Sequence, residues 1–370
     1  MRKEQISDKE AMFVLIIYYI GSSFILGVGG EAKNDAWISV ILGVVMAVPV
    51  ILIYARLLSL FPEKDLFDIL DWAFGKWIGK LFALVYIWYS FHLGALVIRN
   101  FGEFTNTIAI PETPMIVPML CIGIICTVAV TSGIEVIGRI SAAVLPILII
   151  IVSTVSLMAI PKMYFHFLKP ILGNGFLPII KGGFSVFSFP FAESVLLMGV
   201  FSSLKTNKSP YRVYLLGTVI AGLLILMITF RNITVLGSTY SKFYFPAHIA
   251  VSMVSLGDFL QRIELAVAVD FVFGVFIKTS ICLLVTCKGI AKLLRLNDYR
   301  SIVIQVALLM VYFSYTLYDS IMEMAGWAFK VYAYYAFPFQ VIFPIILFVT
   351  VEIKVRRGKK KLQTGVGTDG

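Results

Sequence analysis

Charged side chains are scarce in this sequence. Of its 370 residues, 14% are charged, whereas 59% are hydrophobic. A typical soluble domain is roughly 45–50% apolar and about 25% charged. This composition excludes an ordinary soluble globular protein and indicates that a membrane is the solvent of the folded chain.

Histidine and cysteine are also scarce. The three histidines lie in different segments, and the four cysteines form two pairs five residues apart, without zinc-site spacing: His92, His166 and His248; Cys121 and Cys126; Cys282 and Cys287. We find no nucleophile–base pair and no phosphate-binding loop. The sequence therefore predicts no catalytic residue, no metal, no cofactor and no enzymatic activity.

Long apolar runs dominate the chain instead. A membrane-spanning helix needs about 20 apolar residues. We predict ten such helices, at 11–30, 36–56, 79–99, 113–133, 138–160, 183–203, 212–231, 264–287, 301–318 and 331–352. The predicted fold class is an all-α integral membrane protein. Because ten is an even number, both termini are expected on one side of the membrane.

Basic residues give the orientation. If the N-terminus is cytoplasmic, the cytoplasmic segments hold 21 of the 31 Lys and Arg residues, the outside segments hold 9, and Lys278 lies within a span. Cytoplasmic loops of membrane proteins carry an excess of Lys and Arg. The net charge of +10 therefore indicates orientation in a bilayer rather than nucleic-acid binding. Both termini are predicted to be cytoplasmic.

The connections complete the predicted organisation. Residues 1–10 form a cytoplasmic N-terminus, and residues 11–160 hold the first five helices, with an interfacial helix at 63–76. Residues 161–182 form an outside connection. Residues 183–353 hold the last five helices, with an outside lid at 238–261, and residues 354–370 form a basic cytoplasmic tail.

Two of the predicted spans carry helix-breaking residues. The first contains "GSSFILGVGG" at 21–30, with the break expected at Gly21–Ser23, and the sixth contains Pro190 after a Gly- and Ser-rich start. Interrupted spans at corresponding positions of two halves indicate an inverted-repeat transporter with a binding site at the breaks. The alternative is a pair of kinks without a function.

Three ionisable residues lie inside predicted spans: Glu193, Asp270 and Lys278. An ionisable group near the bilayer centre is costly, so each is a candidate functional residue. Glu193 follows the break in the sixth span, where it would hold an ammonium group, anchor the unwound backbone or titrate. The alternative for all three is a structural ion pair between helices.

The chain resembles the B subunits of spore germinant receptors, the endospore germination permeases of the amino acid/polyamine/organocation superfamily. Short motifs carry the resemblance over about residues 5–355: "QIS" at 5–7, "IGSSFILGVG" at 20–29, "DAWIS" at 35–39, "GKWIGKLF" at 75–82, "RNFGEF" at 99–104, "PETP" at 111–114, "LKPILGNG" at 168–175 and "FPFAESVLL" at 189–197. The resemblance implies a leucine-transporter-like fold, which is a five-plus-five inverted repeat with helices 1 and 6 broken.

The resemblance, together with the breaks, assigns candidate site residues. Those expected to bind the ligand are Gly21, Ser22, Ser23, Phe184, Ser185, Phe187, Ser188, Phe189, Pro190 and Glu193. Those expected on an ion or proton pathway are Glu193, Asp270, Lys278, Thr279 and Ser280. The hydroxyls of the eighth helix match a cation site of the fold, where the Lys278 ammonium would replace a sodium ion.

The resemblance also implies a function. We expect a nutrient-sensing subunit in the inner membrane of a spore, which binds a small amino acid at the midplane between helices 1 and 6. It would signal to two partners, a receptor A subunit and a lipoprotein C subunit. Two alternatives stay open, namely a proton-coupled amino acid transporter and a water or ion conduit gated by partner subunits.

Overall fold

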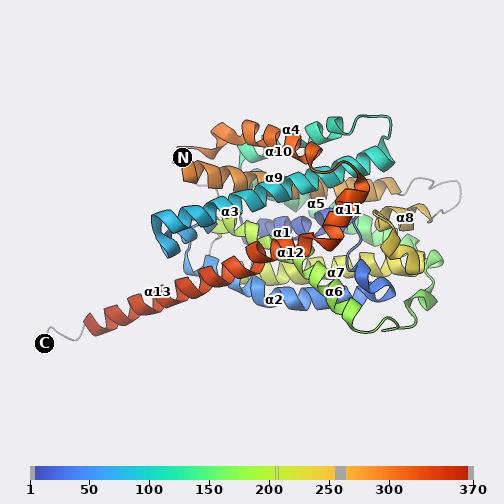
Figure 1. The fold of residues 1–370 in the computed structure, drawn as a ribbon, viewed down its shortest axis with the longest axis horizontal. Coiled ribbons are helices and arrows are strands. Elements are labelled where there is room, and N and C mark those ends of the chain that lie inside the picture. The colour runs from blue at the N-terminus through green and yellow to red at the C-terminus, as the bar shows by residue number, and fades with distance from the viewer. Residues whose placement is uncertain (1–4, 205, 207, 255–263, 366–370) are drawn as a thin grey trace.

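The computed structural model describes residues 5–204, 206, 208–254 and 264–365. Across these residues the chain is helical and contains no strand. The helices run mainly along one long axis, and the two ends of the chain lie toward the same end of the molecule (Figure 1). The helices are α1 Asp8–Ser23, α2 Ala36–Leu60, α3 Leu66–Phe104, α4 Ile116–Ser132, α5 Ile134–Met158, α6 Leu177–Val186, α7 Ser209–Leu236, α8 Pro246–Ser252, α9 Glu264–Leu294, α10 Val303–Thr316, α11 Ile321–Lys330, α12 Tyr332–Phe337 and α13 Phe343–Gly365.

Helices occupy each of the ranges predicted to span the membrane. Among the described residues, seven helical segments are long and apolar enough to cross a membrane, or eight if the pair Tyr299–Thr316 and Ile321–Lys330, bent by 101°, forms one span. Two of the other predicted spans correspond to shorter helices, because α1 has 16 residues and α4 has 17. The structure describes a multi-pass membrane protein.

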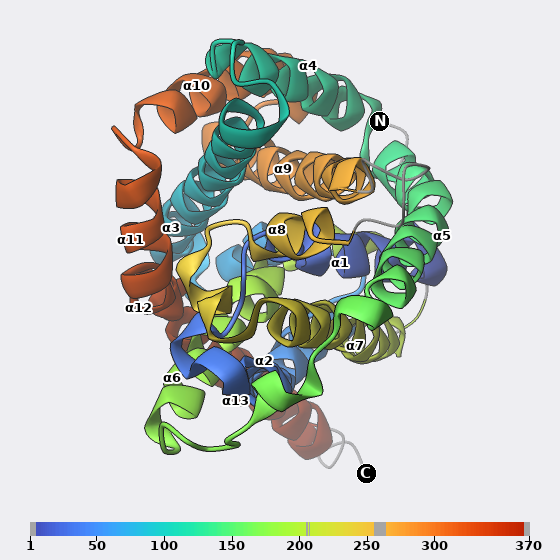
Figure 2. The ribbon, with the colours of Figure 1, turned by 90° about the vertical axis from the view of Figure 1, so that its right-hand side faces the viewer.

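Helix α1 lies at the centre of the bundle, where α5, α7 and α9 pack around it (Figure 2). From Val14 to Ser23 every residue of α1 is buried. The approach to α9 is very close, since a Cβ atom on Gly274 would lie 2.5 Å from the Cα atom of Gly21. Glycine is therefore required where the end of α1 crosses α9.

The outer surface of the bundle is apolar. Large hydrophobic side chains are more than half exposed on several helices, among them Ile124, Leu223, Ile304 and Leu309. Soluble monomers rarely expose contiguous apolar surface on this scale. Lipid is the environment in which such a surface is stable.

The beginning of α3 is a separate short helix. Gly75, with φ of 76°, breaks the helical path after Phe74, and Asp65 caps the start through reciprocal hydrogen bonds with Asp68. This segment lies where the sequence predicts an interfacial helix at 63–76. Parts of three predicted segments lie outside the described residues, namely 1–4 of the N-terminus, 255–261 of the lid and 366–370 of the tail.

Candidate functional site

The first break follows α1. The helix continues to Ser23, because the Ser23 hydroxyl donates back to the carbonyl of Tyr19 at 2.6 Å, and it unwinds over Phe24–Gly29 rather than at the predicted Gly21–Ser23. No regular outer half-helix follows, since the chain turns at Gly29, with φ of 68°, into a short 3₁₀ helix at Gly30–Asp35. Tyr240 satisfies both backbone groups of Val28, at 3.0 Å to its N–H and 2.8 Å to its carbonyl.

The second break lies after α6, where the sequence predicts it. Phe189 has a non-helical backbone conformation with φ of −124° and ψ of 111°, and the chain then forms a 3₁₀ helix at Ala192–Gly199. Unwound backbone at membrane depth needs partners from the protein or from water.

Four side chains from other helices supply those partners. Three tyrosine hydroxyls donate to carbonyls at the start of the 3₁₀ helix that follows the second break, Tyr18 to Glu193 at 3.2 Å, Tyr54 to Ala192 at 3.3 Å and Tyr214 to Ser194 at 3.1 Å. The Gln340 amide donates to the carbonyl of Ser188 at 3.0 Å. This set of donors holds the break in one shape.

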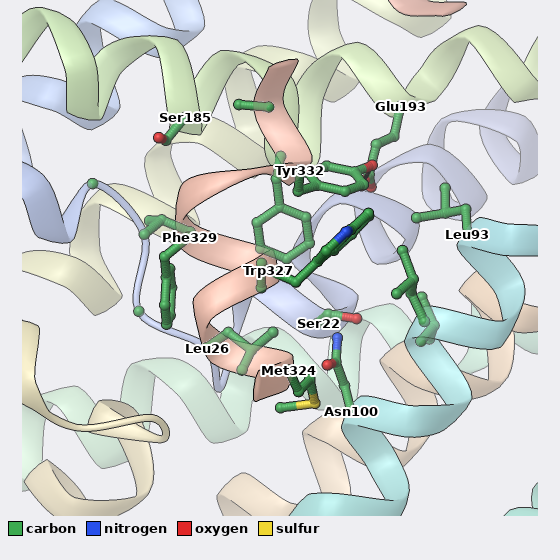
Figure 3. Close-up of a pocket in the computed structure, with 18 of the residues that line it drawn as sticks. Ser22, Leu26, Leu93, Asn100, Ser185, Glu193, Met324, Trp327, Phe329 and Tyr332 are labelled. Atoms are coloured by element: carbon green, nitrogen blue, oxygen red, sulfur yellow. Dashed lines mark hydrogen bonds between the residues drawn. The ribbon is translucent and has the colours of Figure 1, made fainter. Parts of the chain in front are cut away.

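A cavity of about 70 Å³ lies between the two breaks (Figure 3). One water needs roughly 10–15 Å³ of such space, so the cavity holds several waters or one small ligand. Its lining comes from four regions: Ser22, Leu26, Gly27, Val28, Gly29 and Glu31 at the first break; Leu93, Leu96, Val97 and Asn100 on α3; Ser185, Phe189 and Glu193 at the second break; and Tyr318, Met324, Trp327, Ala328, Phe329, Tyr332 and Ala333 over α11 and α12.

The cavity is mostly apolar with a few polar groups. The Ser22 hydroxyl is buried without a hydrogen-bond partner among the described residues. Asn100 adds a buried amide, and Ser185 donates its hydroxyl to the Glu31 carboxylate. A pocket with an apolar wall and a small number of polar groups is typical of small-molecule sites.

Glu193 is one of two carboxylates that line this cavity, together with Glu31, and it is fully buried. One carboxylate oxygen is paired with the Lys278 ammonium of α9, and the other accepts a hydrogen bond from the Tyr332 hydroxyl of α12. The Lys278 ammonium also lies over the aromatic rings of Tyr18, at 5.3 Å, and Phe189, at 4.8 Å. Both oxygens of Glu193 are thus already engaged.

Four of the ten predicted ligand-binding residues line the cavity, namely Ser22, Ser185, Phe189 and Glu193. The others lie close by with different contacts. Gly21 packs on Gly274, Ser23 bonds within α1, and Ser188 donates to Gln340 at 2.9 Å. Phe184 stacks on Phe187 and contacts the tilted ring of Tyr334, and Pro190 is buried beside Phe191.

The predicted ion-pathway residues divide into two places. Lys278 is joined to Glu193, and its neighbours Thr279 and Ser280 have buried hydroxyls without a hydrogen-bond partner in the described structure. Asp270 lies elsewhere, since eight residues along α9 correspond to about 12 Å. It is buried and interacts electrostatically with Arg231 of α7. The described residues contain no group of three or more potential metal ligands from His, Cys, Asp and Glu.

The sequence prediction missed the helix that covers the cavity. Helix α11 and the start of α12 contribute Met324, Trp327, Ala328 and Tyr332 to the lining. A signal was present, because Ser320 caps the helix and Met324, Trp327 and Ala328 follow at helical spacing. Asn100 and Tyr332 carried no comparable signal, since Asn100 directly follows Arg99 and Tyr332 is one of three tyrosines within 332–335.

Comparison with known proteins identifies the family. The profile described as "Spore germination protein", the spore permease family, matches residues 5–354. The chain belongs to this family of spore germination proteins. It is 27% identical to spore germination protein KB of Bacillus subtilis (strain 168) over 97% of this chain and 98% of that protein. It is 26% identical to spore germination protein GerQB of Bacillus cereus over 95% and 98% of the two chains.

Solved structures with the same fold are transporters. A nucleobase-cation-symport-1 family transporter, Mhp1, matches with a TM-score of 0.66 and 14% identity over 87% of this chain and 74% of its own. MhsT, solved in complex with L-phenylalanine, matches with a TM-score of 0.65 and 13% identity over 91% and 88% of the two chains. This spore permease family member therefore has a transporter-type fold. Its family is one of permease-type proteins rather than enzymes.

Proposed function

We propose that the protein is the nutrient-sensing subunit of a spore germinant receptor, and that it binds a small amino acid in the cavity between the two broken spans. The observation that carries the proposal is this cavity of about 70 Å³, closed by α11 and α12 and lined by both breaks. Membership of the spore germination family supports the receptor role. The proposed ligand is a small aliphatic amino acid.

The lining supports that ligand class. The unpartnered Ser22 hydroxyl and the Asn100 amide are suited to the polar groups of an amino acid. Leu93, Leu96 and Met324 favour an apolar side chain. Glu193 is neutralised by Lys278, so we propose that it anchors the site rather than binding the ligand ammonium directly.

Closure of α11 and α12 would carry the signal. The Tyr332 hydroxyl joins α12 to Glu193, and Glu193 joins the second break to α9. A ligand that fills the cavity beneath Trp327 would favour the covered conformer over an open one, because a ligand shifts the population toward the state that it binds better. Lys278, which lies where α1 meets α9, would take the place of a coupling cation.

We further propose the arrangement that the family resemblance implies. The chain would form ten spans in two inverted repeats of five, with both termini in the cytoplasm and the protein in the inner membrane of the spore. Its partners would be a receptor A subunit and a lipoprotein C subunit. Relatives named as spore germination proteins of Bacillus support a receptor assembly.

A transporter is the second candidate, and the fold of Mhp1 and MhsT favours it. In that case the bound amino acid would cross the membrane with a proton. Uptake of labelled amino acid into proteoliposomes along a pH gradient distinguishes the two. Binding without uptake supports the sensor, whereas sustained uptake supports the transporter.

The test of the proposed function uses two tryptophan substitutions on α11. Ala328 lines the cavity, whereas a Cβ atom on Gly326 would meet nothing within 4 Å. We expect alanine or valine to raise the thermal midpoint of the purified protein and of Gly326→Trp, and Ala328→Trp to abolish that shift. Spores with Ala328→Trp should then fail to germinate on the same amino acid. Equal ligand shifts in both variants would contradict the proposed site.

A further inference from the structure

A second hollow lies between α2, α5 and α7, on the lipid-facing surface of the bundle. Its volume is about 400 Å³, and we call it the α2–α5–α7 groove. Its apolar walls include Ile41 of α2 and Leu223, Leu226 and Met227 of α7. Leu223 is 62% exposed, so the groove opens toward the surrounding bilayer.

Three polar atoms of the groove residues have no hydrogen-bond partner among the described residues. They are the indole nitrogen of Trp37, the hydroxyl of Ser156 and one guanidinium nitrogen, Nη1, of Arg231. Arg231 is 1% exposed and Ser156 is 7% exposed. An unsatisfied buried polar group is destabilising, so three among the residues of one groove indicate a missing partner rich in acceptors.

Arg231 supplies the positive charge at this end of the groove, and the carboxylate of Asp270 is its charged neighbour. The other two guanidinium donors of Arg231 are taken by the Asn232 side chain, at 3.1 and 2.9 Å. Asp270 interacts with Arg231 electrostatically, but no hydrogen bond or contact within 4 Å joins them, and both carboxylate oxygens of Asp270 are themselves unpartnered. Nη1 of Arg231 therefore has no hydrogen-bond partner among the described residues, like the two neutral groups of Trp37 and Ser156.

The three donors lie near the ends of their helices. Trp37 is the second residue of α2, Ser156 lies two residues before the end of α5, and Arg231 lies five residues before the end of α7. The apolar wall runs deeper, since Leu223 is about 12 Å further along α7 than Arg231. The groove thus has polar groups near the helix ends and an apolar wall that extends away from those ends.

We propose that the α2–α5–α7 groove binds one glycerophospholipid, with its phosphate at Trp37, Ser156 and Arg231 and an acyl chain along Leu223 and Met227. The donors lie at one end of the groove and the apolar wall extends away from them. The phosphate and the acyl chain of a phospholipid have the same arrangement. A phosphodiester supplies several acceptors and one negative charge, which complements the guanidinium of Arg231. This site is separate from the amino acid cavity, with which it shares no lining residue.

Two variants test the two ends of the site. Trp37→Phe with Ser156→Ala removes two donors and leaves Arg231, Asn232 and Asp270 unchanged. Leu223→Trp fills the apolar channel. The matched control is Ile124→Trp, because Ile124 is 61% exposed and lines another lipid-facing groove, between α4 and α10, that has no buried unpartnered donor among the described residues.

The measurement is native mass spectrometry of the purified protein titrated with phosphatidylglycerol or with diacylglycerol of the same acyl chains. We expect one phosphatidylglycerol to be retained by the wild type and by Ile124→Trp. Loss of two hydrogen bonds predicts affinity about tenfold weaker in the double variant. Leu223→Trp should weaken binding by a similar factor.

Three results would overturn the proposal. The first is equal phosphatidylglycerol affinity in the double variant and the wild type, which would mean that the donors serve Asp270 and water instead. The second is equal loss in Ile124→Trp and Leu223→Trp. The third is retention of diacylglycerol as strong as that of phosphatidylglycerol, because the donors would then not bind the phosphate. These lipid-binding measurements do not depend on amino acid binding in the cavity between the two breaks.

Discussion

Lys278 and Glu193 form an ion pair in which both side chains are fully buried. The pair joins the middle of α9 to the 3₁₀ helix that follows the second break, and Tyr332 closes it from α12. Two charges in a low-dielectric interior are stable only together, since removal of one leaves the other uncompensated. The pair thus fixes the position of the second break against the helix that supports the first one.

Breaking this pair from one side should be more harmful than replacing both partners. We expect Lys278→Met or Glu193→Gln to destabilise the protein by about 3–5 kcal/mol, as is usual when one partner of a buried pair is removed. The double variant should recover much of that loss. Thermal midpoints of the wild type, the two single variants and the double variant in detergent give the coupling energy between the two side chains. Losses that simply add would show that the pair has no structural role.

The crossing of α1 and α9 should not tolerate a single added methyl group. A Cβ atom on Gly274 would lie 2.5 Å from the Cα atom of Gly21, backbone against backbone. We expect Gly274→Ala to destabilise the protein by about 1–3 kcal/mol or more, as overpacking does. Gly326→Ala is the control, because its Cβ atom would meet nothing within 4 Å. Equal thermal midpoints for the two variants would contradict the close crossing.

Tyr240 should hold the first break. Its hydroxyl both accepts from the N–H and donates to the carbonyl of Val28. We expect Tyr240→Phe to cost about 1–3 kcal/mol for each group left unsatisfied. Hydrogen exchange in peptides that cover residues 24–29 should increase in this variant. Tyr312→Phe, at a tyrosine that is 67% exposed, should leave that exchange unchanged.

Arg99 should restrain the bend between α10 and α11. It donates to the carbonyl of Tyr315 at 2.7 Å, and two of its nitrogens donate to one oxygen of Glu103, at 2.9 and 2.7 Å. Lysine lacks the planar guanidinium group that forms these three bonds at once. We expect Arg99→Lys to raise hydrogen exchange several-fold over residues 315–330. Arg139→Lys, at a side chain that is 71% exposed, serves as the control.

Asp65 should make stability depend on pH. Burial, together with the neighbouring carboxylate of Asp68, raises the pKa of Asp65 above its usual range, although Lys292 opposes this shift. Because the folded state then binds the proton more tightly than the unfolded state, stability falls as pH rises through the raised pKa. Asp65→Asn keeps a capping side chain and removes the titration. Thermal midpoints from about pH 4 upward should decline in the wild type relative to the variant.

Much of the architecture was predictable because the membrane restricts the choices. A chain that is 59% hydrophobic must bury its backbone in helices, and the lengths of the apolar runs place those helices along the sequence. Pro190 also placed the second break correctly, since proline cannot donate an intrahelical hydrogen bond. The first break was placed too early, because glycine permits unwinding without requiring it, and Ser23 bonds back to Tyr19.

The sequence alone determined that this is a helical membrane protein with two interrupted spans, an intramembrane Glu and an intramembrane Lys, because these properties depend on local composition and spacing. Only the tertiary structure decided that Lys278 reaches Glu193, that Tyr332 completes the pair, and that α11 covers the cavity. The two contacts of Glu193 join residues 85 and 139 positions apart. Their partners are selected by how the helices pack, which no local pattern in the sequence encodes.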